Sequence, residues 1–291
     1  MKISIILVNY NTKDLTRDCL NSVFEKTTGV EFEVFVVDNN SQDGSCEMIE
    51  QEFPQVKLIK NKENLGFGKA NNIAIRQSRA KYVFLLNTDT ILLNNAVKIF
   101  FDFMEKPENE KVGCCGGNLY NQNEIHQHSY GKFHTLKRVA FTTIGLNFIF
   151  RNYYYNKMTT QGKNEENELK EVEYITGADM FLRKSVLDEV GLFDEDFFMY
   201  FEETELSFRI NKNGYKSVII PEAKIIHLCG LSGKIPLEKF KIYKTSEFLY
   251  FEKCKSIKIK NMVKCLYLIR YFWAFKSKTD YFKKLIIIFK I

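Results

Sequence analysis

The chain has 291 residues, of which 45% are hydrophobic and 27% are charged, and this composition excludes an intrinsically disordered protein. The formal net charge of +6 is unevenly distributed: residues 233–291 contain 15 Lys and Arg against 4 Asp and Glu, whereas residues 1–232 contain 27 against 32. Because the larger part is net acidic, we expect no nucleic acid partner.

The cysteines and the apolar stretches indicate in which cellular compartment the protein is found. The seven cysteines include no CxxC pair, so neither a disulfide framework nor a zinc site is expected, and reduced thiols indicate the cytoplasm. The apolar run at residues 3–8 is too short for a signal peptide. The apolar stretch at residues 265–275 falls short of the roughly 20 residues that a membrane-spanning helix needs. We therefore expect a cytoplasmic protein.

Short apolar runs that end in polar residues alternate with segments of helical periodicity near the N-terminus. The runs are ISIILVNY, FEVFVVDN, VKLIKN and YVFLLN. This alternation predicts an α/β fold with a parallel sheet that helices cover on both faces. Ligands of such sheets bind at the carboxyl ends of the strands, where Asn9, Asp38 and Asp89 are expected.

The rest of the chain is less regular. Residues 156–171 are almost wholly polar, which predicts a mobile surface loop. A strand over residues 173–183, a helix from near Ser185 and a last strand over residues 216–228 are expected to follow. From Gly233 onward the chain is Lys-rich and aromatic, with helical periodicity in places.

The turns after the first two strands restrict the kind of ligand. NYNTKDL after the first strand contains no glycine, which excludes a Rossmann GxGxxG turn and a P-loop at this position. Asp38 closes the second strand in VVDNNSQDGS. Asp38 either lies at the start of a helix, where polar side chains accept hydrogen bonds from free backbone N–H groups, or it accepts a hydrogen bond from the imide N–H of a uracil or thymine ring.

Two further turns have both a structural and a functional interpretation. In NLGFGKANN, Gly66 and Gly68 permit unusual backbone angles, and the next helix either is simply capped or offers its first amides to an anion. In LLNTDT, Asp89 is either a turn residue or a ligand of a divalent cation that also binds a diphosphate.

The sequence DEDFFMYFEETE at residues 194–205 contains six acidic residues around the apolar FFMYF. On an ordinary surface helix these carboxylates would be solvated. The interleaved aromatic residues indicate burial, so we expect some of the carboxylates to lie in a pocket. Burial raises the pKa of a carboxyl group, as general-base catalysis requires.

Histidines provide one candidate metal ligand. His227 ends the last strand, where it is either structural or completes the coordination of a metal held by Asp89. The HxH spacing of His126 and His128, followed by His134, resembles a metal pair, but its Gly- and Asn-rich surroundings favour a solvated loop.

Together these motifs resemble family 2 inverting glycosyltransferases, specifically the rhamnosyltransferase-like bacterial branch with a GT-A fold. The matching segments are ILVNYN, VVDNNSQDGS, NKENLGFGKANN, LLNTDT, TGADMFLRKSVLDEVGLFDEDFFMYFEETELSFRI and IIHLCGLS. The resemblance implies a mostly parallel central sheet flanked by helices in a domain at residues 1–232. Residues 1–110 would be its nucleotide-binding half and residues 111–232 its acceptor half, before a basic, helical extension at residues 233–291.

The resemblance also implies roles for individual residues. Glu203 would be the general base, and Asp89 with His227 would hold Mg²⁺ or Mn²⁺. The implied donor-binding residues are Asn9, Asp38, Asn64, Gly66, Asn71, Asn87 and Asp89. The implied sugar or acceptor pocket contains Gly177, Ala178, Asp179 and Glu202. The chain departs from the family pattern twice, because Asn87 replaces the first acid of DxD and Glu203 replaces the usual Asp.

The implied function is transfer of a sugar from a UDP- or dTDP-sugar to a hydroxyl of a glycan or lipid-linked acceptor, with inversion, in cell-surface polysaccharide assembly. One alternative is a nucleotidyltransferase that makes nucleotide sugars, but NYNTKDL lacks the Gly-rich triphosphate loop that it needs. The other is a non-catalytic sugar- or lipid-binding protein with a decayed site, which only Asn87 suggests.

The basic, aromatic extension has two interpretations. It is either a helical cap whose lysines keep the protein soluble, or a contact with an anionic membrane leaflet. Lysines beside Trp273 and the terminal LIIIF favour the second, which predicts a peripheral location on the inner face of the plasma membrane.

Overall fold

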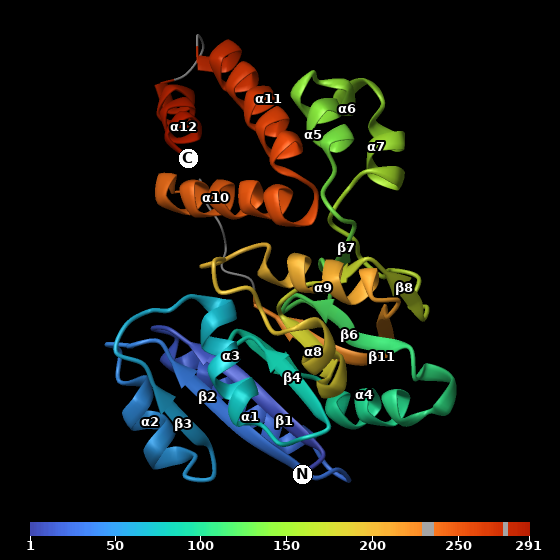
Figure 1. The fold of residues 1–291 in the computed structure, drawn as a ribbon. Coiled ribbons are helices and arrows are strands. Elements are labelled where there is room, and N and C mark those ends of the chain that lie inside the picture. The colour runs from blue at the N-terminus through green and yellow to red at the C-terminus, as the bar shows by residue number, and fades with distance from the viewer. Residues whose placement is uncertain (229–235, 276–278) are drawn as a thin grey trace.

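The computed structural model describes residues 1–228, 236–275 and 279–291. Its centre is a nine-stranded sheet with the order β3-β2-β1-β4-β10-β6-β11-β5, and β8 pairs with β11 beside this path. Figure 1 shows the sheet with helices on both faces and a group of helices beyond one end. The predicted α/β class is confirmed.

The first four strands of the sheet are parallel and alternate with helices, as predicted. They are β1 (Ile3–Asn9), β2 (Phe32–Asp38), β3 (Lys57–Lys60) and β4 (Tyr82–Leu86), and the helices between them are α1 (Lys13–Lys26), α2 (Ser45–Glu52) and α3 (Phe67–Gln77). Asn9 is directly opposite Asp38 at the ends of β1 and β2. Polar side chains at the strand ends are therefore neighbours.

The other strands extend the sheet beyond β4. They are β5 (Thr90–Leu92), β6 (Val112–Tyr120), β8 (Lys170–Val172), β10 (Asp179–Arg183) and β11 (Lys216–His227). β10 is antiparallel to β4 and β6, while β6 and β11 are parallel to each other. β5 and β8 run antiparallel to β11. The strands β1, β2, β3, β4, β6 and β11 share one direction, so the sheet is mostly parallel.

Two apolar cores lie on the two faces of the sheet because side chains alternate along each strand. Leu7 of β1 belongs to the core with α1, α2 and α4 (Ala96–Glu105), which is followed by η1 (Pro107–Asn109). Ile6 belongs to the core with α3, α8 (Lys184–Val190) and α9 (Glu202–Lys212). A two-stranded sheet of β7 (Tyr130–Gly131) and β9 (Tyr174–Ile175) lies beside α9.

A third apolar core lies within a group of helices from two parts of the chain, and we call this group of helices the helical layer. They are α5 (Leu136–Thr143), α6 (Leu146–Ile149), α7 (Arg151–Lys157), α10 (Leu237–Cys254), α11 (Ile257–Phe275) and α12 (Thr279–Lys290). Val139 of α5 packs in one cluster with Phe251 of α10 and Tyr267 of α11. Figure 1 shows α5 to α7 beside α10 and α11. No helix in the described ranges is both long and apolar enough to cross a bilayer.

The structure corrects two expectations. The polar segment 156–171 is not only a surface loop, because it starts in α7, ends in β8 and buries Asn164, which hydrogen bonds to Asn118. His134 is buried in the helical layer rather than solvated, because the layer closes over it. The predicted boundary between residues 232 and 233, and the end of IIHLCGLS, lie outside the described residues.

Candidate functional site

Two adjacent cavities lie where the parallel strands end. One, the strand-end cavity, has a volume of about 420 Å³, and the other, the carboxylate cavity, has a volume of about 330 Å³. Phe67, Asn87 and Met199 line both cavities. The strand-end cavity is also lined by Val8, Tyr10, Thr12, Leu15, Asn39, Asn64, Gly66, Thr88, Asp89 and Leu228. The carboxylate cavity is also lined by His128, Thr176, Gly177, Ala178, Tyr200, Glu202, Glu203 and His227.

Asp89 and His227 meet at the boundary between the cavities. Asp89 lies in the turn from β4 to β5, and the pairing of β5 with β11 places Thr90 opposite His227. The Asp89 Oδ1 atom is 3.3 Å from His227 Nε2, and Leu228 N donates to the Asp89 carbonyl at 2.8 Å. The structure thus brings together the two residues predicted as metal ligands.

The Asp89 carboxylate and the His227 imidazole fit a divalent cation that also binds a substrate. A carboxylate oxygen and an imidazole nitrogen are both ligands of such cations. Within the described parts of the chain, no group of three or more His, Cys, Asp and Glu could hold a metal ion. A cation at Asp89 and His227 would therefore take its remaining ligands from a bound substrate or from water.

A glycine turn positions the wall that the cavities share. Gly66 has a φ of +81°, and a Cβ at this position would lie 2.1 Å from the carbonyl oxygen of Phe198, so the turn requires glycine. Phe67 N donates to the same oxygen at 3.0 Å. Asn64 Oδ1 accepts from Gly66 N at 3.0 Å and from Asn39 Nδ2 at 3.2 Å. This network holds the segment around Phe198 against the start of α3.

Asp38 and Asn9 lie behind the wall of the strand-end cavity. Asp38 is only 1% exposed, and its carboxylate accepts from Asn9 Nδ2 at 2.6 Å and from Ser41 N at 2.9 Å. Asn9 Nδ2 also donates to Ser41 Oγ at 3.0 Å. These bonds fix the loop that carries Asn39, which does line the cavity.

Asn71 and Asp179 are likewise buried behind the walls. Asn71 Nδ2 donates to the Phe67 carbonyl at 3.1 Å, within α3. Asp179 Oδ2 accepts from Gly117 N at 2.6 Å, and its other oxygen has no partner among the described residues. Burial raises the pKa of Asp179 well above its ordinary value. Of the predicted pocket residues, Gly177 and Ala178 therefore reach the carboxylate cavity, whereas Asp179 lies beneath it.

The turn into α9 aims two carboxyl groups at the carboxylate cavity. Tyr200 and Phe201 both have left-handed backbone conformations, with φ of 70° and 69°, which are uncommon for bulky residues. Phe201 is buried against Tyr250, with ring centroids 5.6 Å apart. This anchored turn places Glu202 and Glu203 at the start of α9, where both line the cavity.

The two neighbouring carboxyl groups differ in how strongly their surroundings favour the protonated form. Glu202 is 4% exposed and its Oε2 has no partner among the described residues, whereas Glu203 is half-buried and accepts from Thr204 Oγ1 at 3.3 Å. Burial raises the pKa of both carboxyl groups, and the charge of Glu203 raises the pKa of Glu202 further. When the pair holds one proton, Glu202 keeps it and Glu203 is ionised.

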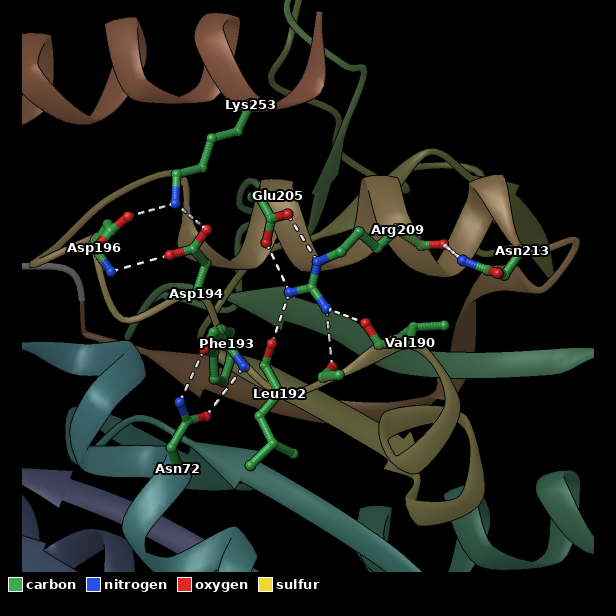
Figure 2. Close-up of polar contacts among 11 residues, drawn as sticks. Asn72, Val190, Leu192, Phe193, Asp194, Asp196, Glu205, Arg209, Asn213 and Lys253 are labelled. Atoms are coloured by element: carbon green, nitrogen blue, oxygen red, sulfur yellow. Dashed lines mark hydrogen bonds and ion pairs between the residues drawn. The ribbon is translucent and has the colours of Figure 1, made fainter.

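An arginine holds the start of this acidic segment, as Figure 2 shows. Arg209 of α9 forms a two-bond ion pair with Glu205, at 2.7 Å for each bond. The same guanidinium donates to the carbonyls of Val190 at 2.6 Å and Leu192 at 2.7 Å. Glu205 is therefore structural, and the chain that leads to the cavity is fixed to α9.

Helices α3 and α10 hold the next residues of the segment. Asn72 Nδ2 donates to the Phe193 carbonyl at 2.9 Å and Asn72 Oδ1 accepts from Phe193 N at 3.1 Å. Lys253 of α10 bridges Asp194 and Asp196 (Figure 2). The helical layer thus contacts the loop that forms the cavity.

The sequence did not reveal the apolar part of the walls. Met199 and Tyr200 lie in FFMYF, where their hydrophobicity predicted burial but not a cavity surface. Phe67 follows Gly66 directly, so the strained turn is the signal that could have found it. His128 lines the cavity although its surroundings resemble a solvated loop, and burial lowers its pKa.

Comparisons with known proteins place these features in a family. The profile described as "Glycosyl transferase family 2" matches residues 4–191. The chain is 26% identical over 231 residues to N-acetylglucosaminyl-diphospho-decaprenol L-rhamnosyltransferase of Mycobacterium tuberculosis, covering 75% of this chain and 73% of the relative. It is also 26% identical over 226 residues to poly-beta-1,6-N-acetyl-D-glucosamine synthase of Staphylococcus epidermidis, covering 76% of this chain and 48% of that protein.

Two solved structures resemble the fold. One is the mannosyltransferase PcManGT from Pyrobaculum calidifontis in complex with GDP-Man and Mn²⁺, with a TM-score of 0.59 and 16% identity over 96% of this chain and 73% of that one. The other is GalNAc-T7 with UDP, GalNAc and Mn²⁺, with a TM-score of 0.60 and 14% identity over 91% of this chain and 54% of that one. These similarities confirm the predicted GT-A fold.

Proposed function

Since the chain belongs to glycosyl transferase family 2 and is a glycosyltransferase, we propose that it transfers a sugar from a UDP- or dTDP-sugar to a hydroxyl of a lipid-linked or glycan acceptor, with inversion. Family membership favours this reaction over the nucleotidyltransferase and over a non-catalytic binding protein. The M. tuberculosis relative is named for a diphospho-decaprenol substrate, which favours a lipid-linked acceptor.

The observation that carries the proposal is the boundary between the two cavities. Asp89 lines one cavity, Glu203 lines the other, and Asn87 lines both. A donor whose nucleotide occupies the strand-end cavity would place its diphosphate beside Asp89 and its sugar near Asn87. An acceptor hydroxyl in the carboxylate cavity would then lie between that sugar and Glu203.

Glu203 is the proposed general base. Its partly buried carboxylate takes the proton of the acceptor hydroxyl while that oxygen attacks the anomeric carbon and the bond to the diphosphate breaks. Attack from the face opposite the leaving group inverts the anomeric centre. Glu202 keeps its own proton, so it adds no second negative charge beside the base.

Asp89 and His227 are the proposed ligands of Mg²⁺ or Mn²⁺. When bound, such a cation would offset the negative charge that the leaving nucleoside diphosphate gains. Both solved relatives contain Mn²⁺, which supports the proposal. Because Asn87 replaces one family carboxylate, the protein contributes few charged ligands and relies on the diphosphate for the rest.

The other predicted residues receive supporting roles in the proposal. Asn64 and Gly66 border the nucleotide, Asn71 supports the Phe67 wall, and Asp38 either contacts the base or positions the loop of Asn39 through the bonds described above. Most donor contacts then come from residues 1–110, and Met199, His227 and Leu228 add contacts from the second half. The sugar or acceptor contacts come from residues 111–232, through Gly177, Ala178 and Glu202, with Asp179 beneath them.

The helical layer is the proposed contact with the inner face of the plasma membrane. It exposes large apolar side chains next to basic ones, a combination that suits an anionic bilayer surface. The exposed apolar residues include Phe148, Ile149, Phe150, Ile269, Phe272, Trp273, Phe282 and Phe289. Sedimentation with phosphatidylglycerol vesicles, compared with phosphatidylcholine vesicles, tests this contact; equal recovery in the supernatant of both would contradict it.

Binding of nucleoside diphosphates tests the donor class. Thermal-shift measurements with UDP, dTDP and GDP, each with and without Mn²⁺, are expected to show stabilisation by UDP or dTDP that Mn²⁺ increases. If neither UDP nor dTDP stabilises the protein under any of these conditions, the proposed donor class is wrong.

A further inference from the structure

A third cavity lies inside the helical layer, separate from the two at the strand ends. Its volume is about 320 Å³, and its walls come from α5 to α7 on one side and from α10 and α11 on the other. Arg138, Lys244 and Arg270 contribute three positive charges to the wall, and Glu247 contributes one negative charge. We call it the cationic cavity.

The negative charge in the cationic cavity is already neutralised. Lys244 and Glu247 are 7% and 1% exposed and form an ion pair of 2.6 Å. Tyr267 donates to Glu247 at 3.0 Å, and Lys244 lies 3.6 Å from the centre of the Tyr267 ring. Burial opposes ionisation of Glu247, but Lys244 lowers the pKa of this carboxyl far below its ordinary value. Among the described residues Arg138 and Arg270 form no ion pair, so their charges remain to be balanced.

Arg138 has a buried donor that the described residues leave without an acceptor. Its Nη1 is 3.1 Å from His134 Nδ1, and because a guanidinium only donates, this histidine is a neutral acceptor. Burial lowers the pKa of His134, in agreement. The Arg138 Nε atom is buried without a partner among the described residues, and so is Asn147 Oδ1 in the same wall. A buried guanidinium donor without an acceptor is costly, so the cavity is suited to an anionic ligand.

One aromatic layer separates the cationic cavity from the proposed base. Tyr243 lines the cationic cavity, and its ring contacts Tyr200 and Phe201, with centroids 5.6 and 5.2 Å apart. Tyr200 in turn lines the carboxylate cavity with Glu203. Burial raises the pKa of Tyr243; the charges of Glu247 and Glu203 act in the same direction and that of Arg138 opposes them, so this tyrosine lies within electrostatic reach of both sites.

The residues next to the cationic cavity in the chain are exposed and apolar. Phe148 and Ile149 come directly after Asn147, and Phe272 and Trp273 come just after Arg270 and the buried Tyr271; these four apolar residues are exposed. An anion-binding interior with apolar side chains nearby suits a ligand that carries both a phosphate and a hydrocarbon chain.

We propose that the cationic cavity binds the diphosphate of an isoprenoid-diphosphate-linked acceptor, through Arg138 and Arg270, on the far side of Tyr243 from Glu203. This inference rests on the proposed function, because it assigns the site that holds the lipid end of the acceptor. A phospholipid headgroup offers the same phosphate chemistry, so the experiment must separate the two sources.

The test measures binding of farnesyl diphosphate to the full chain in detergent, by fluorescence of Trp273. This is the single tryptophan of the protein and lies three residues after Arg270. We expect saturable binding that weakens at least tenfold in Arg270→Gln and Arg138→Gln, while farnesol binds more weakly and equally to all variants. Lys258→Gln removes an exposed charge from the same helix and should change the affinity less than twofold.

Four outcomes would overturn the proposal. The first two are equal affinity of Arg270→Gln and Lys258→Gln for farnesyl diphosphate, and equal affinity of the wild type for farnesol and farnesyl diphosphate. The third is that phosphatidylglycerol displaces bound farnesyl diphosphate as well as unlabelled farnesyl diphosphate does. The fourth is that Asp89→Asn loses binding of farnesyl diphosphate while Arg270→Gln keeps it. Arg270 is exposed, so its variant remains informative if Arg138→Gln does not fold. Failure of nucleoside diphosphates to stabilise the protein would instead refute the proposed donor, and it is measured separately.

Discussion

The Asp89 carboxylate lies 3.3 Å from the imidazole of His227, although 138 positions separate them in the chain. The turn after β4 carries one residue and the end of β11 carries the other, and the pairing of β5 with β11 joins them. Each residue lines a different cavity, so the pair marks the place where donor and acceptor would meet.

Replacing Asp89 tests its proposed role at the diphosphate. We expect Asp89→Asn to weaken Mn²⁺-dependent binding of the nucleoside diphosphate by about 10- to 100-fold, because a charged contact contributes roughly 1.5–3 kcal/mol. Isothermal titration with and without EDTA measures this. His227→Gln should have a smaller effect in the same direction. Wild-type affinity of Asp89→Asn in the presence of Mn²⁺ would contradict the assignment.

Gly66 is predicted to be indispensable for the wall between the cavities. In Gly66→Ala the new methyl group would collide with the Phe198 carbonyl, so we expect a lower melting temperature and loss of stabilisation by nucleoside diphosphates. Gly214→Ala is the matched control, because Gly214 has the same φ of +81° and no atom within 4 Å of the added methyl group. If the two variants lose stability and ligand binding equally, backbone strain alone explains the effect and the collision does not matter.

Glu202 is predicted to destabilise the fold at neutral pH. Because burial raises its pKa, the folded state holds a proton that the unfolded state releases above about pH 4.3, so stability falls as pH rises. Glu202→Gln mimics the protonated form and should raise the melting temperature at pH 8. The expected rise is about 2–4 °C for each kcal/mol gained in the free energy of unfolding, with a smaller gain near pH 4. Exposed Glu222→Gln should show no such pH-dependent gain. A gain that is independent of pH would contradict this explanation.

The pH dependence of transfer should report the protonation of Glu203. Burial raises its pKa above the ordinary value of about 4.3, and only the ionised carboxylate can accept the hydroxyl proton. We therefore expect kcat/KM to fall as pH decreases through this raised pKa and to be constant above it. A profile that stays flat down to about pH 4.3 would exclude Glu203 as a base with a raised pKa.

Local patterns in the sequence predicted much of the fold but less of the site. Alternating apolar runs predicted β1 to β4 and their parallel arrangement, and Asp89 after β4 predicted where the strand-end cavity opens. The bond from Ser41 N to Asp38 agrees with one of the two interpretations of VVDNNSQDGS, but the sequence could not show that Asn9 also donates to Asp38, because that bond joins the ends of two strands.

Long-range packing also explains what the C-terminal composition concealed. The Lys-rich tail predicted basic helices, but not that Lys244 would be buried beside Glu247, since charge counts do not distinguish surface from interior. Nor could the HxH pattern predict that α10 closes over His134. The contacts of His134 with Glu247 and Tyr250 join segments about a hundred residues apart, which no local pattern reveals.

The most direct test of the account compares Glu203→Gln with the wild type in transfer and in donor binding. The donor is the nucleotide sugar that stabilises the protein, the acceptor is a lipid extract, and Glu222→Gln is the matched control. We predict that Glu203→Gln lowers the rate of transfer by about 10²–10⁴-fold and leaves the dissociation constant of the donor essentially unchanged. Transfer by Glu203→Gln at the wild-type rate would contradict the account.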